Sequence, residues 1–233
     1  MSALKESKGY FITFEGIEGA GKSTHAARLY ETLKEKGYPV VLTREPGGTP
    51  IGEKLRTLVT DPANGEMDRL TELLVMAASR AQHLHQIIRP ALGEGKIVIS
   101  DRFTDATLAY QGYGREMPLN MVRELNELAA WNCRPDLTLL FDLEPYHAMS
   151  RVRDRRQIEE QLPDRLERLN IDFYDRVRKG YLDLAYEEPH RFRKFDAAQP
   201  LETLWSQVFE CTIREISRNW GDPERLEMRG LHL

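Results

Sequence analysis

The chain has 233 residues, 41% of them hydrophobic, which is enough for one sizeable α/β core. A formal net charge of -4 and an isoelectric point of about 5.9 exclude the strongly basic surface typical of nucleic-acid-binding proteins. No run is long and apolar enough to span a bilayer, the start lacks the apolar stretch of a signal peptide, and only two cysteines occur, far apart. We therefore expect a soluble cytoplasmic protein without nucleic-acid or membrane partners.

Short apolar segments alternate along the chain with longer segments of helical periodicity. The expected strands are 10–15, 39–43, 97–100, 137–143 and 193–196. The expected helices are 24–37, 69–89, 120–130, 146–156, 166–185 and 201–219. This alternation predicts an α/β fold with a mainly parallel sheet covered by helices on both faces. Because no linker-like segment interrupts it, residues 1–233 are expected to form a single domain, with a core over about 10–216 and a surface tail at 220–233.

The run GIEGAGKS at residues 16–23 matches the phosphate-binding pattern G-x-x-x-x-G-K-[ST] in full. It follows an expected strand and precedes an expected helix, which is the context that this motif requires. Its glycines let backbone N–H groups converge on phosphate oxygens, Lys22 would bridge the β- and γ-phosphates, and the Ser23 hydroxyl would bind Mg²⁺. An ordinary glycine turn capped by Ser23 is the simpler alternative. The residues predicted to bind ATP in this loop are Gly16, Ile17, Glu18, Gly19, Ala20, Gly21, Lys22, Ser23 and Thr24.

The remaining sequence narrows the class of nucleotide-binding protein. The guanine-reading pattern N-K-x-D of GTPases is absent, and motor or transport ATPases usually need a longer chain. A small phosphotransferase is therefore the simplest interpretation.

An acid and a base follow the apolar strand 97–100. Asp101 stands where P-loop proteins place a carboxylate near Mg²⁺, and Arg102 comes directly after it. Open α/β sheets bind ligands at the carboxyl ends of their strands, so Asp101 is predicted to hold the metal together with Ser23. A plain surface ion pair is the alternative.

Met76 and Arg80 lie four residues apart and so project from one helix face. An apolar surface and a guanidinium on one face would suit a flat base and a phosphate. A core methionine beside a surface arginine is the commoner explanation of such a pair.

The densest positive cluster is the run RVRDRR, with Arg151, Arg153, Arg155 and Arg156. A solvated helix face is the usual explanation of such a cluster. In the phosphate loop, however, Lys22 is the only basic residue. Mobile arginines that close over the site would add the missing positive charge and exclude water.

Taken together, these segments resemble the thymidylate kinase family, bacterial type, over about residues 10–216. The motifs that carry the resemblance are FEGIEGAGKST (14–24), TREPGGT (43–49), AASRAQH (77–83), DRFTDATLAYQG (101–112), PDLTLLFDL (135–143), DRLE (164–167) and DAAQPLE (196–202). The resemblance implies a P-loop NTPase fold. It also implies transfer of the γ-phosphate of ATP to thymidine 5′-monophosphate (dTMP) in dTTP biosynthesis, with Mg²⁺ as cofactor.

Roles in the acceptor site follow from the same resemblance. Glu18 would face the 3′-hydroxyl of the acceptor sugar, and Glu45 would lie near the metal and the acceptor. Arg80 and Arg102 would hold the acceptor phosphate. The remaining acceptor residues are Arg56 and Gln111, which would read the thymine, Met76, which would pack on it, Thr107 beside the base, and Tyr110, which would crowd a 2′-hydroxyl.

Glycine at position 19, with arginines in a lid instead, matches the bacterial subtype. The lid would span about 151–165, with Arg153 and Arg155 touching the transferring phosphate and Arg151 nearer the adenine. The turn 196–200 would also lie beside the adenine. The predicted catalytic residues are Lys22, Arg102, Arg153 and Arg155.

Two positions depart from many relatives, which have phenylalanine where this chain has Met76 and serine where it has Ala106. A thioether still packs on a ring face, so the role of Met76 is expected to survive. The resemblance implies a homodimer, for which the apolar stripe of the helix 69–89 is a candidate interface. A kinase of another nucleoside monophosphate and a catalytically inactive nucleotide-binding regulator are the alternative functions.

Overall fold

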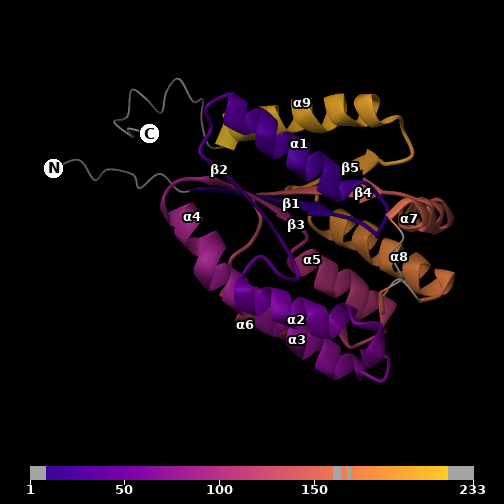
Figure 1. Ribbon diagram of the computed structural model, residues 1–233. Helices are drawn as coiled ribbons and strands as arrows, with labels where there is room; N and C mark the ends of the chain where they lie inside the picture. Colours follow the sequence, from indigo (N-terminus) through magenta and orange to yellow (C-terminus); the bar gives the residue numbers. More distant parts are fainter. Residues whose placement is uncertain (1–8, 160–163, 167–168, 220–233) are drawn as a thin grey trace.

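The computed structural model describes residues 9–159, 164–166 and 169–219. Its strands are β1 (Tyr10–Glu15), β2 (Val40–Arg44), β3 (Ile97–Asp101), β4 (Leu137–Asp142) and β5 (Phe192–Asp196). They form one parallel sheet in the order β2-β3-β1-β4-β5 (Figure 1). The predicted parallel sheet is confirmed, whereas the predicted tail 220–233 and residues 160–163 of the predicted lid lie outside the described residues.

Helices cover both faces of this sheet, as predicted. They are α1 (Lys22–Glu35), α2 (Pro50–Thr60), α3 (Arg69–His83), α4 (Arg89–Gly93), α5 (Thr104–Thr107), α6 (Leu119–Ala130), α7 (Pro145–Glu159), α8 (Ile171–Glu187) and α9 (Leu201–Asn219), with the 3₁₀ helix η1 (Pro62–Asn64) and the π-helical segments η2 (Leu84–Ile88) and η3 (Leu108–Gly114). Figure 1 shows α1 and α9 on one side of the sheet and α3, α5 and α8 on the other. Among the helices of the described residues, none combines the length and the apolar composition that crossing a membrane requires.

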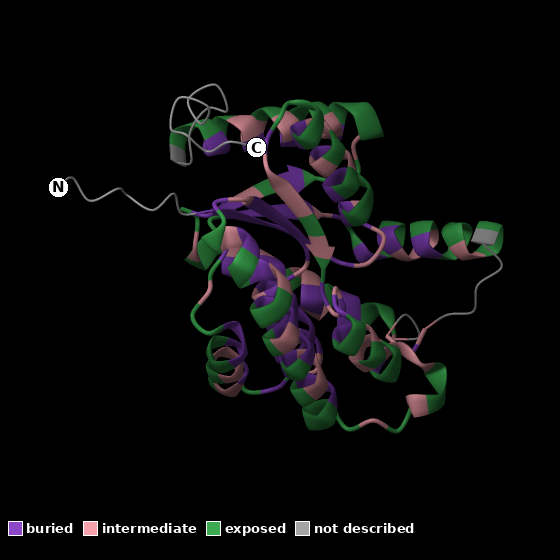
Figure 2. Cartoon of the chain, turned by 60° about the vertical axis from the view of Figure 1, so that its left-hand side comes forward, coloured by how far each residue is buried: buried purple, intermediate pink, exposed green. Residues whose placement is uncertain are grey.

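The central strands are buried along their whole length, which Figure 2 shows as purple arrows between helices with green outer faces. Successive side chains of β1 point to opposite faces, so Ile12 and Phe14 join the larger core while Phe11 packs with Val98 and Phe103 in a second one. Because helices cover both faces, both sets are buried, and so are the two polar residues of the strand, Thr13 and Glu15. This explains why the strands read as continuous apolar runs in the sequence.

The single helix predicted over 69–89 differs from the structure. It ends as an α-helix at His83, passes through the π-helical segment η2 and resumes as α4. Pro90 gives the physical reason, because its ring has no N–H and would clash with a regular turn before it, whereas a widened turn leaves room. The predicted apolar stripe is also divided, since Leu73 is buried but Leu70 and Leu74 are about half exposed.

The helix predicted over 166–185 begins later, at Ile171. Asn170 caps it, because its side-chain oxygen accepts a hydrogen bond from the backbone N–H of Phe173 at 3.0 Å. The start of α2 was not predicted, although Thr49 is a comparable cap that accepts from the N–H of Gly52 at 2.9 Å. Both caps agree with the ordinary side-chain rules for helix starts.

Candidate active site

The phosphate loop connects β1 to α1, and two of its glycines are required by close packing. Gly16 has φ 135°, and a Cβ there would lie 2.4 Å from the carbonyl oxygen of Phe141. Gly19 has φ 80°, and its Cβ would lie 2.5 Å from the carbonyl oxygen of Ala148 in α7. A side chain at either position would displace the neighbouring backbone. At position 19 the loop is packed directly against the helix that carries the arginine cluster.

Lys22 lies at the start of α1 and is buried. Its Nζ donates a hydrogen bond to the carbonyl oxygen of Ile17 at 2.7 Å, so the side chain folds back over the loop. Burial, together with the nearby charge of Arg102, lowers the pKa of Lys22 to about 8. The amine is therefore held where its charge is costly in the free protein and where an anion would stabilise it.

Ser23 and Asp101, the two residues predicted to hold a metal, lie in contact beside the phosphate loop. The Ser23 hydroxyl donates a hydrogen bond to Oδ2 of Asp101. The other carboxylate oxygen, Oδ1, is buried and accepts no hydrogen bond within the described part of the chain, and it lies 3.8 Å from the Arg102 guanidinium. A hydroxyl and a carboxylate oxygen are the hard ligands that Mg²⁺ takes alongside phosphate oxygens and water. The described residues contain no cluster of three or more His, Cys, Asp or Glu side chains that could hold a metal ion.

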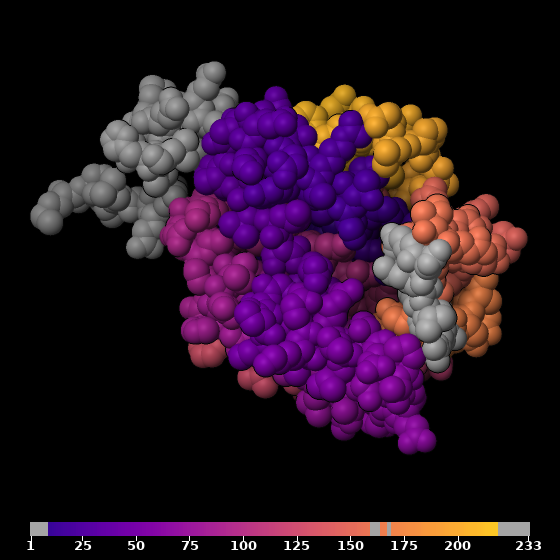
Figure 3. Space-filling model, in the orientation of Figure 1, coloured from indigo at the N-terminus to yellow at the C-terminus, as the bar shows by residue number. Residues whose placement is uncertain are grey.

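A pocket opens beside the loop at the carboxyl ends of the strands. In the space-filling view the molecule is hollowed between α2 and the α7–α8 side (Figure 3). The pocket brings together every residue predicted to bind the acceptor: Glu18, Glu45, Arg56, Met76, Arg80, Arg102, Thr107, Tyr110 and Gln111. It also contains residues that the sequence analysis did not single out: Pro46, Thr60, Phe103, Asp164, Leu166 and Tyr174. Ala106, noted as a departure, lines it too.

Arg80 is buried in this pocket and is nearly saturated by protein partners. Its Nε donates to Glu45 at 2.8 Å and one terminal nitrogen to Asn126 at 2.6 Å. The other terminal nitrogen donates to the carbonyl oxygen of Phe103 at 3.0 Å and to the Thr107 hydroxyl at 2.8 Å. A guanidinium has five N–H groups, so this arrangement leaves one for a ligand. Arg80 is predicted to hold the acceptor phosphate, and doing so through two N–H groups would require it to give up a protein partner.

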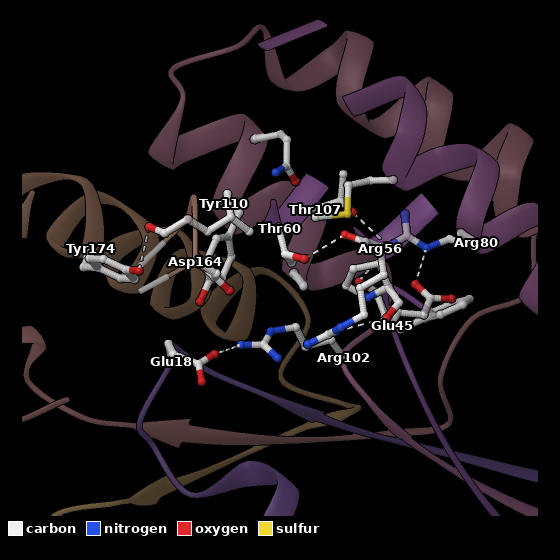
Figure 4. A pocket seen from close by; sticks show the side chains of 16 residues that line it. Glu18, Glu45, Arg56, Thr60, Arg80, Arg102, Thr107, Tyr110, Asp164 and Tyr174 are labelled. Carbon is white, nitrogen blue, oxygen red and sulfur yellow. Dashed lines mark hydrogen bonds and ion pairs between the residues drawn. The ribbon is translucent and has the colours of Figure 1, made fainter. Parts of the chain in front are cut away.

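Arg102 instead faces the loop. Its guanidinium donates to Glu18 at 2.8 Å and lies 5.9 Å from the centre of the Tyr110 ring. Figure 4 shows Glu18 and Arg102 turned toward each other on one side of the pocket, with Arg80 and Glu45 farther along. Although burial alone would raise the pKa of Glu18, the charges of Arg102 and Lys22 hold it well below its ordinary value. Glu18 is therefore an ionised carboxylate at neutral pH.

The predicted lid arginines extend from α7. Arg155 donates to the second carboxylate oxygen of Glu18 at 3.2 Å, so Glu18 joins the loop to this cluster. Arg151 donates to the carbonyl oxygen of Ala197 at 3.0 Å, within the turn predicted to lie beside the adenine. Arg153 is exposed and makes a long contact of 3.4 Å with the Ser150 hydroxyl. At the far end of the predicted lid, Arg165 is buried and donates to the carbonyl oxygen of Val59 at 2.7 Å.

A buried acid, Glu15, holds the backbone directly after Arg102. Arg102 has φ 72°, a conformation that residues other than glycine adopt only when neighbouring contacts impose it. The next residue, Phe103, donates its N–H to Oε1 of Glu15 at 2.8 Å, and the hydroxyl of Tyr181 donates to Oε2 at 2.9 Å. Burial, with a smaller contribution from the charge of Asp105, raises the pKa of Glu15 to about 8.

This raised pKa predicts a pH-dependent stability. Between pH 4.5 and about 8 the folded protein keeps a proton on Glu15 that the unfolded chain releases. The stabilising contribution of this group is therefore complete below pH 4.5 and is lost as the pH rises through about 8. Glutamine does not titrate, so Glu15→Gln should not lose stability in this way. As the pH rises across this window, the free energy of unfolding of the variant should therefore increase relative to that of the wild type by up to about 1.4 kcal/mol per pH unit. Urea unfolding of both proteins at about pH 5 and about pH 8 measures the difference, and parallel profiles would contradict the assignment.

Two residues that hold the pocket side chains in place, Glu72 and Asn126, were not predicted from the sequence. Glu72 precedes Met76 by four residues, as Met76 precedes Arg80, so the same spacing places all three on one helix face. That spacing was a usable signal for Glu72. Asn126 comes from α6 and meets Arg80 only through the fold, so no local pattern indicated it.

Known proteins similar to this chain agree with the geometry. The family model for thymidylate kinase matches residues 14–208. The thymidylate kinase of Syntrophotalea carbinolica is 48% identical over 213 residues, covering 91% of this chain and 99% of that protein. That of Desulfosudis oleivorans is 50% identical over 206 residues, covering 88% and 96%. The crystal structure of thymidylate kinase from Ehrlichia chaffeensis superposes with a TM-score of 0.70 at 36% identity, covering 88% of this chain and 98% of that one.

The fold and the sequence relationship lead to one conclusion. A five-stranded parallel sheet with the loop between β1 and α1 is the P-loop NTPase fold predicted from the sequence. The family match spans most of the chain and includes both the phosphate loop and the pocket beside it. The chain therefore belongs to the thymidylate kinase family and is an ATP-dependent nucleoside monophosphate kinase that phosphorylates dTMP to the diphosphate.

Proposed function

We propose that the loop 16–23 holds the ATP phosphates and that the pocket beside it holds dTMP, with phosphoryl transfer where the two meet. The observation that carries this proposal is the position of Glu18 and Arg102. Both line the acceptor pocket, and Glu18 belongs at the same time to the phosphate loop. An acceptor phosphate beside Arg102 would thus lie next to the ATP phosphates gathered by Lys22.

The protein contributes charge and position rather than a base. A phosphate monoester is already largely ionised at neutral pH, so its attacking oxygen needs no proton acceptor. Lys22 would neutralise charge on the transferring group, and Arg102 would fix the acceptor phosphate through two N–H groups. Glu18, which now accepts from Arg102 and Arg155, would release these arginines to the phosphates and face the sugar 3′-hydroxyl.

Magnesium fits the oxygen pair formed by Ser23 and Asp101, of which Oδ1 has no hydrogen bond in the described part of the chain. Ser23 and Asp101 would hold Mg²⁺ there, and its charge would neutralise part of the negative charge on the phosphates. Glu45 is engaged with Arg80 and with His83 at 2.9 Å, so we assign it to holding the pocket near the metal.

Replacing Asp101 by asparagine tests this assignment. The Mg²⁺ concentration that gives half-maximal activity should rise by about tenfold, and kcat should fall by about 10²-fold, because a charged ligand is lost. A magnesium titration of the coupled ADP-release assay measures both. Asp183→Asn is the control, because Asp183 is a partly buried carboxylate on α8 that pairs with Lys179 outside the pocket. An unchanged magnesium requirement would remove Asp101 from the metal site.

The base would lie deeper in the pocket. Met76 would pack on its face, Gln111 and Arg56 would read its edge, and Thr107 would lie beside it. All four line the pocket, which supports these roles. Tyr110 is buried next to Arg102, where its ring would crowd a 2′-hydroxyl. The single remaining N–H of Arg80 suits one contact to the acceptor.

The lid assignments rest on the contacts of α7. Arg155 reaches the phosphate loop through Glu18, which supports a role at the transferring phosphate. Arg151 is bound to the turn containing Ala197, which supports a place near the adenine. Arg153, exposed on the same helix, would join Arg155 when the phosphates are bound.

We also propose a homodimer formed through α2 and α3. Leu70 and Leu74 of α3 and Ile51 and Leu58 of α2 are about half exposed, and the two helices pack against each other. An apolar face of this kind marks an interaction surface. Light scattering should give a mass of twice 27.0 kDa for the wild type and near 27.0 kDa for Leu74→Arg. A wild-type mass near 27.0 kDa would rule out the dimer.

We propose further that residues 1–233 act as a single cytoplasmic domain without nucleic-acid or membrane partners. The acidic composition and the nucleotide substrates support this.

A further inference from the structure

Glu72 is a buried carboxylate on α3 that the catalytic account does not use. It is 1% exposed and lies next to the pocket rather than in its wall. Its Oε1 accepts a hydrogen bond from the side-chain nitrogen of Gln111 at 2.9 Å. Arg115 donates to both of its oxygens, at 3.2 and 2.9 Å, and Arg165 donates to Oε2.

These contacts hold Glu72 in place and keep it ionised. Burial alone would raise the pKa of Glu72, but the hydrogen bonds and charge of Arg115, with those from Gln111 and Arg165, lower it below its ordinary value. Arg115 follows η3 in the sequence, and Arg165 is tied to the end of α2 through the backbone of Thr60 at 2.9 Å. The carboxylate therefore has a fixed position between three separate segments of the chain.

An ionised carboxylate only accepts hydrogen bonds, and this restricts the neighbouring amide. Gln111 is 1% exposed, and its side chain could be turned in either of two ways about the last bond. With the carbonyl oxygen toward Glu72, two acceptors would face each other in a buried site, which is costly. The amide nitrogen is therefore directed to Glu72, and the carbonyl oxygen is the end that remains for a ligand.

We propose that Glu72 is a positioning residue that makes Gln111 a hydrogen-bond acceptor toward the base. The inference rests on the proposed role of Gln111 in the acceptor pocket. Thymine and uracil carry an N–H at ring position 3 and so match an acceptor. Cytosine has a bare nitrogen there, and two acceptors would meet. Through Gln111, Glu72 thereby favours thymine and uracil monophosphates over cytosine monophosphates without contacting the base itself.

The experiment compares kcat/KM for dTMP, dUMP and dCMP in four enzymes: the wild type, Glu72→Gln, Gln111→Ala and the double variant. Glutamine at position 72 keeps the shape but both donates and accepts, so the Gln111 amide is free to turn. We expect the preference for dTMP and dUMP over dCMP to fall by about tenfold in Glu72→Gln. In the Gln111→Ala background, the same substitution should change this preference by less than about twofold.

The preference is a ratio of kcat/KM values measured on one preparation. A smaller folded fraction lowers the rates with all substrates by the same factor, so it does not change the ratio. Glu215→Gln is the matched control, because it alters another carboxylate paired with an arginine, Arg193 at 2.9 Å, in α9. Its preference should equal that of the wild type. Radiolabelled phosphate transfer at high enzyme concentration makes the slow dCMP reaction measurable.

Three results would overturn the inference, and they differ in what they leave standing. An unchanged preference in Glu72→Gln, with a lowered one in Gln111→Ala, would remove the role of Glu72 and keep the base pocket. An equal loss of preference with and without Gln111 would show that Glu72 acts by another route. An unchanged preference in Gln111→Ala would reject the base pocket and the inference together.

Discussion

Replacing Lys22 by methionine is expected to lower kcat by about 10³-fold while leaving the protein folded. The Lys22 charge is the one that the phosphate loop itself supplies to the transferring group. Methionine keeps a long apolar chain in the buried site. Because burial lowers the pKa of Lys22 to about 8, the charged amine is disfavoured in the free fold, and its removal should not reduce stability at neutral pH.

A matched control and a pH profile sharpen this test. Lys34→Met removes a lysine from the exposed side of the same helix and should leave kcat unchanged. In the wild type, Lys22 loses its proton above about pH 8, while bound phosphates favour the charged form, so KM for ATP should rise above about pH 8. The methionine variant should lack that rise. Turnover of Lys22→Met within about twofold of the wild type would contradict the mechanism.

Replacing Arg102 by lysine is expected to lower kcat/KM for dTMP by about 10²- to 10³-fold, with little change in KM for ATP. Lysine keeps the charge but loses the planar fork that places two N–H groups on two phosphate oxygens. Each charge-assisted hydrogen bond contributes about 1.5–3 kcal/mol, and two of them account for the expected loss. The fold should tolerate the change, because lysine has the same backbone preferences at φ 72°.

Arg176→Lys is the control for Arg102, since Arg176 binds the backbone of Gly114 outside the pocket and should leave the kinetics unchanged. Initial rates with dTMP and ATP varied independently separate the two substrates. If KM for ATP rose and that for dTMP stayed constant, Arg102 would belong to the donor site.

The phosphate loop and the sheet were predictable because their signals are local. The glycines at 16 and 19 and the strand before them lie within ten residues of one another. Strands such as β1 and β3 are continuous apolar runs because both faces are covered, and this shows directly in the sequence. The position of Asp101 beside the phosphate loop was predictable for the same reason, because it is the last residue of such a strand.

Contacts between distant segments were not predictable in this way. No partner of Arg80 can be recognised from the sequence. In the fold, four of its five N–H groups donate to protein atoms, so only one is left for phosphate. These partners are Glu45, Asn126, Phe103 and Thr107. The division of the α3 stripe also depends on the fold. Leu73 and Leu74 are equally apolar, and only the packing of α3 decides which of them is buried.

The most direct test of the account is the rate of ADP release with ATP and Mg²⁺ in the presence of dTMP, dUMP, UMP, dCMP or GMP. Fast turnover with dTMP, slower turnover with dUMP and little with the others would fit a pocket in which Gln111 reads the base and Tyr110 excludes a 2′-hydroxyl. Equal rates on UMP and dTMP would contradict both assignments. Turnover that peaks on another acceptor would reject the pocket as described and keep the phosphate loop, and no turnover on any acceptor would contradict the account as a whole.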